Sequence, residues 1–309
     1  MTQTSPLLDR SLEIRTDTEK LGRINKLIST AGSRLKTVGI KAGDAEAEIV
    51  LCYLLAIDRL KLFLDGADLL TLDLEKRFWE IVTRRETRYP LQYILGEAWF
   101  YGRRFEVNEN VMVPTPETEL LCEVALRFIR FREIKAPRIL DIGTGSGVVC
   151  ATMVLECPGA QITALDISGE ALEVARSNSK ALGAENIKFL ESDLFGTLDK
   201  NSRFDLILSN PPYIAEYEYD VLPPEVLADP KISLISGAEG LDIIERLISD
   251  SPDYLAPEGK LIFEIGYNQT EAINILIDAN VRYRSSVLMR DLNDIDRVVI
   301  LSPARPDTQ

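Results

Sequence analysis

Apolar residues in the first third of the chain recur at the spacing of amphipathic helices. One run follows Asp44 at positions i, i+3, i+4, i+7 and i+8, which share one helix face. It consists of Ala47, Val50, Leu51, Leu54 and Leu55. A similar run follows Asp73 and ends before Pro90, which disfavours helix at the preceding residue. The pattern predicts a helical bundle over residues 19–92, preceded by a polar, aperiodic segment, residues 1–18, that we expect to be a flexible extension.

A different pattern begins at residue 93. Residues 93–113 alternate loosely between apolar and polar, are rich in aromatic and β-branched side chains, and contain Gly96 and Gly102. These features predict a β-hairpin linker. Over residues 114–309, strand-like and helix-like runs alternate, which is typical of a doubly wound α/β domain with a mostly parallel sheet. The predicted strands are 138–141, 161–165, 187–190, 204–209 and 260–265, and the helices between and around them are 117–132, 148–156, 170–182, 241–249 and 269–279.

The net charge of the chain limits the classes of partner that it is expected to bind. The 309 residues include 35 Lys plus Arg and 49 Asp plus Glu, and the net charge is −14. Residues 1–95 hold 15 basic and 14 acidic side chains, whereas the remainder holds 20 and 35. Because affinity for a nucleic-acid backbone comes largely from clustered cations, we expect no direct nucleic-acid partner. The longest apolar runs fall far short of the roughly 20 residues that span a membrane. The N-terminus lacks the apolar core of a secretory signal, so we expect a cytoplasmic protein.

The absence of histidine and the spacing of the cysteines exclude several kinds of catalytic and metal-binding site. The sequence has no histidine, which rules out Ser-His-Asp and Cys-His catalysis and the usual His-containing zinc sites. Cys52, Cys122, Cys150 and Cys157 form no CxxC pair and are expected to be reduced core thiols. No metal site is predicted.

A glycine-rich turn follows the predicted strand 138–141 and opens the next helix. It reads DIGTGSG, from Asp141 to Gly147. Glycines let a ligand approach the backbone closely, and a helix N-terminus offers free N–H groups. The third glycine comes one residue earlier than in the dinucleotide pattern G-x-G-x-x-G. Asp141 would repel a pyrophosphate but suits a cationic ligand.

Two further acids end the next two strands. Asp166, in ALDIS, can accept both hydroxyls of a ribose. Asp193, in ESDLF, can accept a hydrogen bond from an adenine amino group. Helix caps and turn acids are common at such positions, and a single aspartate would favour that interpretation. Three aspartates in register with a glycine loop favour a ligand site instead.

The strand 204–209 ends in Asn-Pro-Pro-Tyr, residues 210–213. Its two prolines fix φ and donate no N–H, which makes the turn stiff. The side-chain oxygen of Asn210 and the carbonyl of Pro211 can each accept one N–H of a planar NH2 group. That pair of acceptors orients the nitrogen lone pair and favours positive charge on nitrogen. Tyr213 can stack on the flat group, and no titrating base is needed. The other interpretation, a proline turn that only closes a strand, is disfavoured by the cofactor-like motifs at the same sheet edge.

DIGTGSG, ALDIS and ESDLF resemble the successive motifs of class I S-adenosylmethionine-dependent methyltransferases. The resemblance implies a Rossmann-like methyltransferase domain over residues 114–309 with S-adenosylmethionine as cofactor. It implies that Gly143 to Gly147 line the methionine part, that Asp166 holds the ribose, and that Asp193 with Leu194 borders the adenine. The candidate cofactor-binding residues are Asp141, Gly143, Thr144, Gly145, Ser146, Gly147, Asp166, Asp193, Leu194 and Asn210.

Asn-Pro-Pro-Tyr resembles the motif shared by methyltransferases that modify planar nitrogens, which include glutamine amides and exocyclic amines of nucleic-acid bases. Asn210, Pro211 and Tyr213 are the candidate catalytic residues. The same motif leaves the substrate open between a protein glutamine and a nucleic-acid amine.

Longer stretches resemble one family, the protein-(glutamine-N5) methyltransferases of bacterial release factors. These are RYPLQYILGEAWFYGRRFEVNENVMVPTPETE (residues 88–119), SGAEGLD (236–242), FEIGYNQ (263–269) and DRVV (296–299). The family usually has arginine in the hinge motif, where this chain has Thr115. The resemblance implies methylation of the glutamine in the Gly-Gly-Gln motif of class 1 peptide chain release factors. It also implies that residues 19–92 form a substrate-recognition domain, and we expect a monomer.

The same resemblance places the hairpin near the substrate pocket. Phe100 therefore joins Asn210, Pro211, Pro212 and Tyr213 as a candidate substrate contact. Core packing is the other interpretation of Phe100.

Overall fold

The structure, a computed structural model, describes the backbone of residues 6–304 and the side chains of residues 22–304. The chain divides into two compact units, Met1–Leu95 and Gly96–Gln309. None of the helices in the described range is both long enough and apolar enough to cross a membrane.

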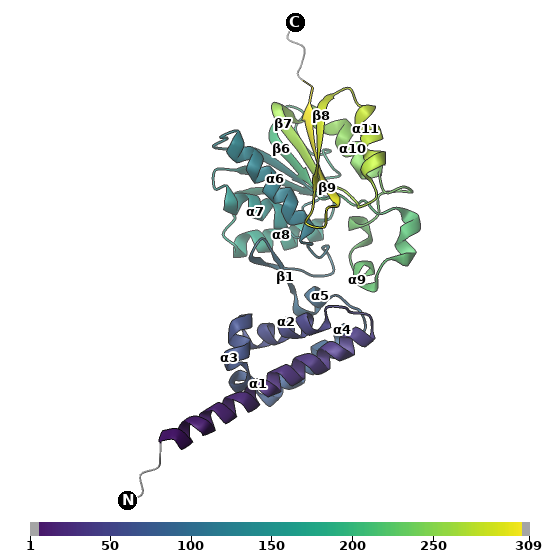
Figure 1. The fold of residues 1–309 in the computed structure, drawn as a ribbon. Helices are drawn as coiled ribbons and strands as arrows, with labels where there is room; N and C mark the ends of the chain where they lie inside the picture. The colour runs from purple at the N-terminus through teal and green to yellow at the C-terminus, as the bar shows by residue number, and fades with distance from the viewer. Residues whose placement is uncertain (1–5, 305–309) are drawn as a thin grey trace, which may run out of the picture. The chain divides into compact units, whose positions relative to one another are not determined.

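The first unit is helical, as the apolar spacing predicts. Its helices are α1 (Pro6–Thr37), α2 (Gly43–Leu55), α3 (Arg59–Leu69), α4 (Leu72–Arg85) and α5 (Leu91–Leu95) (Figure 1). Ala47, Val50 and Leu51 of α2 are buried against Phe78 and Val82 of α4 in one apolar core. The two amphipathic runs therefore face each other, because each contributes the stripe that its helical period defines.

The ends of these helices differ from the sequence pattern. α1 begins at Pro6, so the part of the expected extension after residue 5 is helical, and residues 1–5 lie outside the described range. The cap of α4 is Thr71, whose Oγ1 accepts from the N–H of Leu74 at 3.2 Å, and Asp73 lies within the first turn.

The predicted hairpin consists of β1 (Glu97–Phe100) and β2 (Arg103–Glu106), which pair antiparallel. It belongs to the second compact unit. The Asn178 amide fixes it there, since its Oδ1 accepts from the Glu106 N–H at 2.7 Å and its Nδ2 donates to the Glu106 carbonyl at 2.9 Å. The same Nδ2 also donates to the carbonyl of Ser146 at 2.9 Å, which ties the hairpin to the glycine loop.

In the described residues, seven strands of the second unit form one sheet in the order β5-β4-β3-β6-β7-β9-β8. Strands β3 to β7 pair parallel, and β9 runs antiparallel to both β7 and β8. The strands are β3 (Arg138–Ile142), β4 (Gln161–Asp166), β5 (Ile187–Glu191), β6 (Phe204–Ser209), β7 (Leu255–Glu264), β8 (Tyr283–Arg290) and β9 (Asp296–Pro303). The mostly parallel sheet is confirmed, with predicted strand ends that agree closely for β3 to β6.

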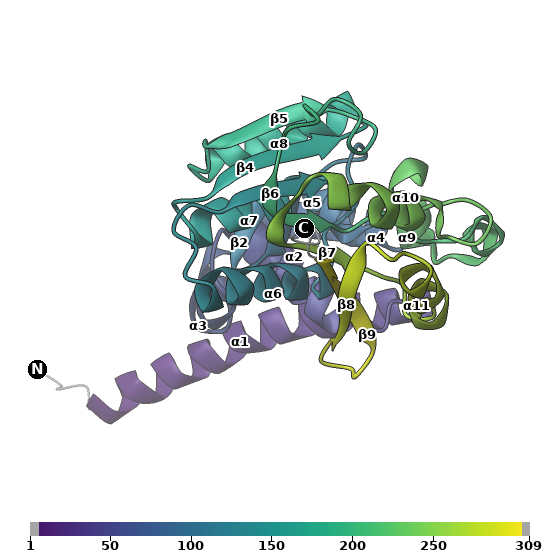
Figure 2. The same cartoon turned by 90° about the horizontal axis from the view of Figure 1, so that it is seen from above.

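Helices cover both faces of this sheet (Figure 2). The helices are α6 (Glu117–Phe131), α7 (Val148–Glu156), α8 (Gly169–Ala181), α9 (Pro224–Leu227), α10 (Asp242–Asp250) and α11 (Thr270–Asp278), with short 3-10 turns η1 (Glu216–Val221), η2 (Lys231–Ser233) and η3 (Ser251–Asp253). Side chains alternate along β3, so Ile139 joins the core under α6 and α7 while Leu140 joins the core under α10 and α11. Strand order reverses between β3 and β6, and in such sheets ligands bind at the carboxyl ends of the strands beside the reversal.

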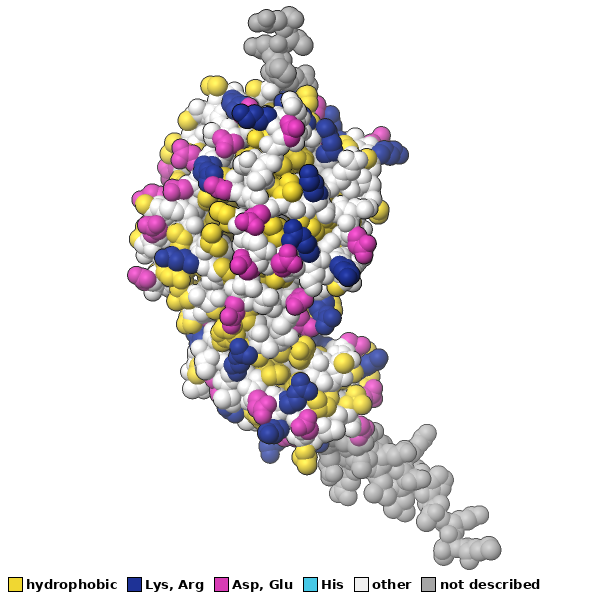
Figure 3. All heavy atoms as spheres, turned by 180° about the vertical axis from the view of Figure 1, so that it is seen from behind, with side chains coloured by type: hydrophobic (Ala, Val, Ile, Leu, Met, Phe, Trp, Pro, Cys, Tyr) yellow, Lys and Arg dark blue, Asp and Glu magenta, His cyan; other side chains and the backbone are white. Residues whose placement is uncertain are grey.

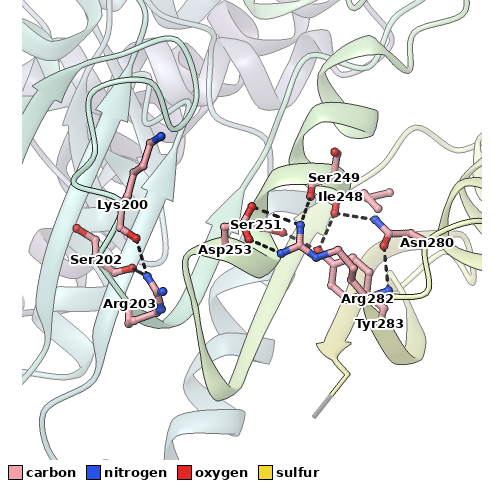
Figure 4. A network of polar contacts seen from close by, with 10 residues as sticks. All are labelled: Lys200, Ser202, Arg203, Ile248, Ser249, Ser251, Asp253, Asn280, Arg282 and Tyr283. Atoms are coloured by element: carbon pink, nitrogen blue, oxygen red, sulfur yellow. Dashed lines mark hydrogen bonds and ion pairs between the residues drawn. The ribbon is translucent and has the colours of Figure 1, made fainter. Parts of the chain in front are cut away.

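A polar network joins the end of α10 to the start of β8, the edge strand of the sheet (Figure 4). The hydroxyl of Tyr283 donates to the carbonyl of Ile248 at 3.0 Å, and Asn280 Nδ2 donates to the same carbonyl at 3.2 Å. Arg282 forms an ion pair with Asp253. The first two contacts satisfy a carbonyl group that the end of a helix leaves open.

Candidate active site

The register of β3 and β6 brings the glycine loop and the Asn-Pro-Pro-Tyr turn together. Ile142, at the end of β3, pairs with Ser209, at the end of β6. The hydroxyl of Ser209 donates to the carbonyl of Ile142 at 2.8 Å. A Cβ built on Gly143 would lie 3.9 Å from the carbonyl oxygen of Asn210. The two motifs, 63 residues or more apart in sequence, therefore share one crevice.

One cavity occupies this crevice, and most of the predicted site residues line it. Those that do are Asp141, Gly143, Thr144, Gly145, Ser146, Asp166, Asp193, Leu194, Asn210, Pro211 and Pro212. Gly147, Tyr213 and Phe100 are not among its lining residues in the described part of the chain. The structure thus brings the cofactor-like motifs to one place, and the other three residues lie outside the lining of the cavity.

Gly147 shapes the loop from behind. It has φ +81° and precedes α7, a conformation that side chains rarely adopt. A Cβ there would lie 3.0 Å from the Cβ of Ala175 in α8. The loop is held further by Asp166, whose carboxylate accepts from the N–H groups of Gly145 at 2.8 Å and Ser168 at 3.0 Å. Gly147 therefore permits close packing of the loop against α8, and its predicted ligand contact stays a prediction.

The three acids of the cavity differ in their surroundings. Asp141 is 1% exposed and accepts from the hydroxyl of Thr144 at 2.7 Å. Burial raises the pKa of Asp141 to about 7, against the opposing effect of the Thr144 hydrogen bond. Burial also raises the pKa of Asp166. Asp193 is exposed and pairs with Arg246 at 3.0 Å. Two desolvated carboxyls in one cavity gain most from a ligand that carries positive charge.

The Asn-Pro-Pro-Tyr turn is held by side chains from two neighbouring elements. Asn210 Nδ2 donates to Oγ1 of Thr118, in the first turn of α6, at 2.9 Å. Gln269 Nε2 donates to the carbonyl of Tyr213 at 2.9 Å and to the carbonyl of Gly240 at 3.0 Å. A Cβ on Gly240 would lie only 2.3 Å from the Tyr213 carbonyl oxygen. The turn is thereby fixed at both its side chain and its backbone.

Tyr213 points toward the interior. Its hydroxyl donates to Oε1 of Glu264, at the end of β7, at 3.4 Å, and its ring packs against the core under α10 and α11. Burial raises the pKa of Tyr213 further above its usual value, so the phenol stays protonated. Its stacking on a substrate group stays a prediction.

The interpretation of Phe100 as a substrate contact is wrong. Its ring is 1% exposed and packs edge-on against Phe105, with centroids 6.2 Å apart, in the core beneath α6 and α7. Strand alternation explains the error, because Phe100 faces inward while the neighbouring Trp99 is 66% exposed. Being near the pocket in sequence does not place a side chain in it.

Two segments that the sequence reasoning did not assign also line the cavity. Asn110, Val111, Met112 and Pro114 come from the chain after the hairpin, and Pro230, Ile232, Ser233 and Ile235 come from the segment around η2. The N–H of Val113 donates to Oδ1 of Asp229 at 3.2 Å, which joins the two. Thr118, Glu264 and Gln269, which hold the turn, were missed as well. All three lie within stretches that carried the family resemblance, which was the available signal.

The fold and this site define a class I methyltransferase. Family models agree, since the "Methyltransferase small domain" matches residues 124–280 and the "PrmC N-terminal domain" matches residues 26–96. The chain is 36% identical over 280 residues to the release factor glutamine methyltransferase of Bacillus cereus, covering 90% of this chain and 98% of that protein. The chain therefore belongs to the family of release factor glutamine methyltransferases.

One further relative and one solved structure are also similar to this chain. The release factor glutamine methyltransferase of Fusobacterium nucleatum is 41% identical over 226 residues, which cover 72% of this chain and 63% of that relative. Among solved structures, the hMettl16 catalytic domain in complex with a 3'UTR hairpin is 15% identical, with a TM-score of 0.52, covering 76% of this chain and 85% of that chain. At that identity the likeness concerns the fold alone.

Proposed function

We propose that this protein transfers a methyl group from S-adenosylmethionine to the side-chain amide nitrogen of the Gly-Gly-Gln glutamine in class 1 peptide chain release factors. Family membership supports the substrate. The observation that carries the chemistry is the orientation of Asn210 in the cavity. Its Nδ2 is committed to Thr118, and within the part of the chain that the structure describes no donor is hydrogen-bonded to its Oδ1.

The residues that line the cavity support S-adenosylmethionine as the methyl donor. Asp141 and Asp166 offer negative charge to a cationic ligand, and Asp166 retains acceptor capacity for ribose hydroxyls. A Cβ on Gly145 would meet no atom within 4 Å, so the loop backbone is open to a ligand there. Bound S-adenosylmethionine would supply an electrophilic methyl group on a positively charged sulfur.

The protein's own task is to position the amide. An amide nitrogen is a poor nucleophile, because its lone pair is delocalised into the carbonyl group. Oδ1 of Asn210 and the carbonyl of Pro211 would each accept one N–H of the glutamine, directing the lone pair at the methyl group. Both acceptors become better partners as positive charge develops on the nitrogen. Pro230 and Ile232 add apolar side chains to the wall of the cavity.

Surface charge supports a protein substrate over a nucleic acid. On the face shown in Figure 3, basic side chains are scattered among acidic ones and do not gather into a stripe. Residues 96–309 carry 20 basic and 35 acidic side chains. A nucleic-acid backbone requires the opposite balance. A release factor substrate also agrees with the expected cytoplasmic location and with a single chain acting alone.

The decisive experiment supplies the purified protein with labelled S-adenosylmethionine and a bacterial class 1 release factor. One methyl group should appear on the Gly-Gly-Gln glutamine in peptide mass mapping. A release factor with that glutamine replaced by glutamate is the matched control and should stay unlabelled. Label on another glutamine, or on added DNA or RNA instead, would contradict the proposed substrate.

We further propose that the helical unit binds the release factor away from the methylated glutamine. Leu60 and Leu64, one turn apart on α3, are each 71% exposed, and together they offer apolar surface that a protein partner can cover. Changing both to glutamate should raise KM for the release factor about tenfold, equal to about 1.4 kcal/mol of binding. The kcat for a short Gly-Gly-Gln peptide should not change. Leu292→Glu, at an exposed position of the other unit, is the control, and an unchanged KM in the double variant would refute the role.

A further inference from the structure

A chain of hydrogen bonds leads from Asn210 away from the cavity into the interior. Asn210 Nδ2 donates to Oγ1 of Thr118 at 2.9 Å, and the hydroxyl of Thr118 donates to Oε2 of Glu264 at 2.7 Å. The three residues come from the turn after β6, the start of α6 and the end of β7. Thr118 is 2% exposed and Glu264 is 1% exposed. Water therefore has little access to compete for these hydrogen bonds.

The direction of this chain is set by Glu264. An ionised carboxylate can only accept, and a threonine hydroxyl has a single proton to give. When Thr118 donates that proton to Glu264, its oxygen can only accept from Asn210. The NH2 end of the Asn210 amide must then face Thr118, and Oδ1 must face the other way. Thr115, 3.3 Å from Thr118 through their hydroxyl oxygens, can add a further donor without changing this direction.

We propose that Glu264 is a positioning residue that acts through Thr118 to keep the oxygen of the Asn210 amide directed at the substrate amide. The inference deepens the proposed function and rests on it, because it concerns the same acceptor. The proposal also means that two residues of the FEIGYNQ stretch position the Asn-Pro-Pro-Tyr turn. Glu264 sets the side chain of Asn210, and Gln269 holds the backbone at Tyr213.

Protonation of Glu264 would reverse the chain. A protonated carboxyl can donate to Thr118, which can then donate to Oδ1 of Asn210 and turn the amide over. Burial raises the pKa of Glu264 to about 7. The charges that face it act in both directions, since Arg297 of β9 lowers the pKa and Glu117 of α6 raises it. Tyr213 and Thr118 favour the ionised form through their hydrogen bonds.

The first test uses the enzyme alone, so it does not depend on the substrate. The side-chain NH2 signals of Asn210 are observed by NMR in protein labelled with 15N-asparagine and are assigned by their loss in Asn210→Ala. They should shift with pH around a midpoint near 7 in the natural protein. The shift should disappear in Glu264→Gln, which cannot ionise but still fills the site. Signals that titrate identically in both proteins, or in neither, would overturn the inference.

The second test measures glutamine methylation by variants of Thr118. Thr118→Val keeps the shape but breaks the chain, and it should lower kcat about tenfold, the usual effect of one lost hydrogen bond of about 1.4 kcal/mol. Thr118→Ser keeps the hydroxyl and should restore kcat. Thr152→Val is the matched control, because the Thr152 hydroxyl is buried without a hydrogen-bond partner in the described residues. An unchanged kcat and pH profile in Thr118→Val would refute the role of Glu264, whereas an inactive natural protein would refute the proposed function itself.

Discussion

Replacing Asn210 with alanine should lower the rate of methyl transfer to the release factor by about 10²–10³-fold, as expected when one preorganised polar group at a reacting centre is removed. In the proposed mechanism, the side-chain oxygen is one of two acceptors for the substrate NH2 group. Without it, the Pro211 carbonyl holds only one N–H, and the amide can rotate away from the methyl group. The loss should appear mainly in kcat, because the effect depends on charge that develops during transfer.

Single-turnover assays and calorimetric titration of S-adenosylmethionine would separate the two contributions. The acids that suit the donor are untouched in this variant, so donor affinity should change far less than the rate. Asn201→Ala is the control, since Asn201 is an exposed asparagine before the opposite end of β6. A variant that bound the donor and retained more than about a tenth of the rate would contradict the role of Asn210.

The carboxyl edge of the sheet could be predicted because its signals are local. Strands β3, β4 and β6 are short apolar runs that are followed by glycine, aspartate or proline. Such a pattern predicts a buried strand. In a parallel sheet, the ends of adjacent strands lie at one edge, so the motifs had to converge. The order of the strands was not available from these signals, because it depends on which apolar faces pack best.

The segment between the Asn-Pro-Pro-Tyr turn and α10 could not be predicted. It has no steady period, and its shape depends on contacts between distant backbone groups. Ile214 donates its N–H to the carbonyl of Leu234 at 2.9 Å, and the N–H of Ser236 returns to the carbonyl of Ile214 at 3.0 Å. Such pairing of residues about 20 positions apart leaves no mark on local sequence. Several walls of the cavity were missed for this reason.

Hydrogen-bonding roles were harder still to predict than positions. Thr118 follows the pattern of any first-turn residue of a helix, and Glu264 ends an apolar run of β7, where a charge is unexpected. A buried acid at the end of such a strand is costly unless it is hydrogen-bonded. The type of residue at position 264 is therefore a second signal, beside the family resemblance, that could have indicated a hydrogen-bonding role.

The second large effect concerns Asp141 and the dependence of stability on pH. Burial raises the pKa of Asp141 from 3.8 to about 7, so the folded protein binds a proton that the unfolded chain releases between these values. The free energy of unfolding contributed by this carboxyl must then fall as pH rises from about 4 to about 7, and it should level off at higher pH. At pH 8 the ionised, buried group destabilises the fold by at most about 4 kcal/mol. Asp141→Asn removes that cost.

Urea unfolding at pH 5 and pH 8 would measure this difference. Asp141→Asn should be more stable than the natural protein by up to about 4 kcal/mol at pH 8 and by much less at pH 5, where the natural carboxyl is already protonated. Glu185→Gln, at an exposed position, is the control and should show no such dependence. Equal stability of Asp141→Asn and the natural protein at pH 8 would contradict the raised pKa.

Binding of S-adenosylmethionine should lower the pKa of Asp141, whereas burial raises it. A cationic ligand beside Asp141 favours its ionised form, so the natural protein should bind S-adenosylmethionine more tightly at pH 8 than at pH 6 and should release a proton as it binds. Asp141→Asn should lose most of this dependence along with part of its affinity. The ionised carboxyl of Asp141 would thus lower the stability of the ligand-free protein and raise its affinity for S-adenosylmethionine. Such opposite effects on stability and function are common at ligand sites. Calorimetry in two buffers of different ionisation enthalpy detects the released proton directly, and no release from the natural protein near pH 7 would separate Asp141 from the ligand.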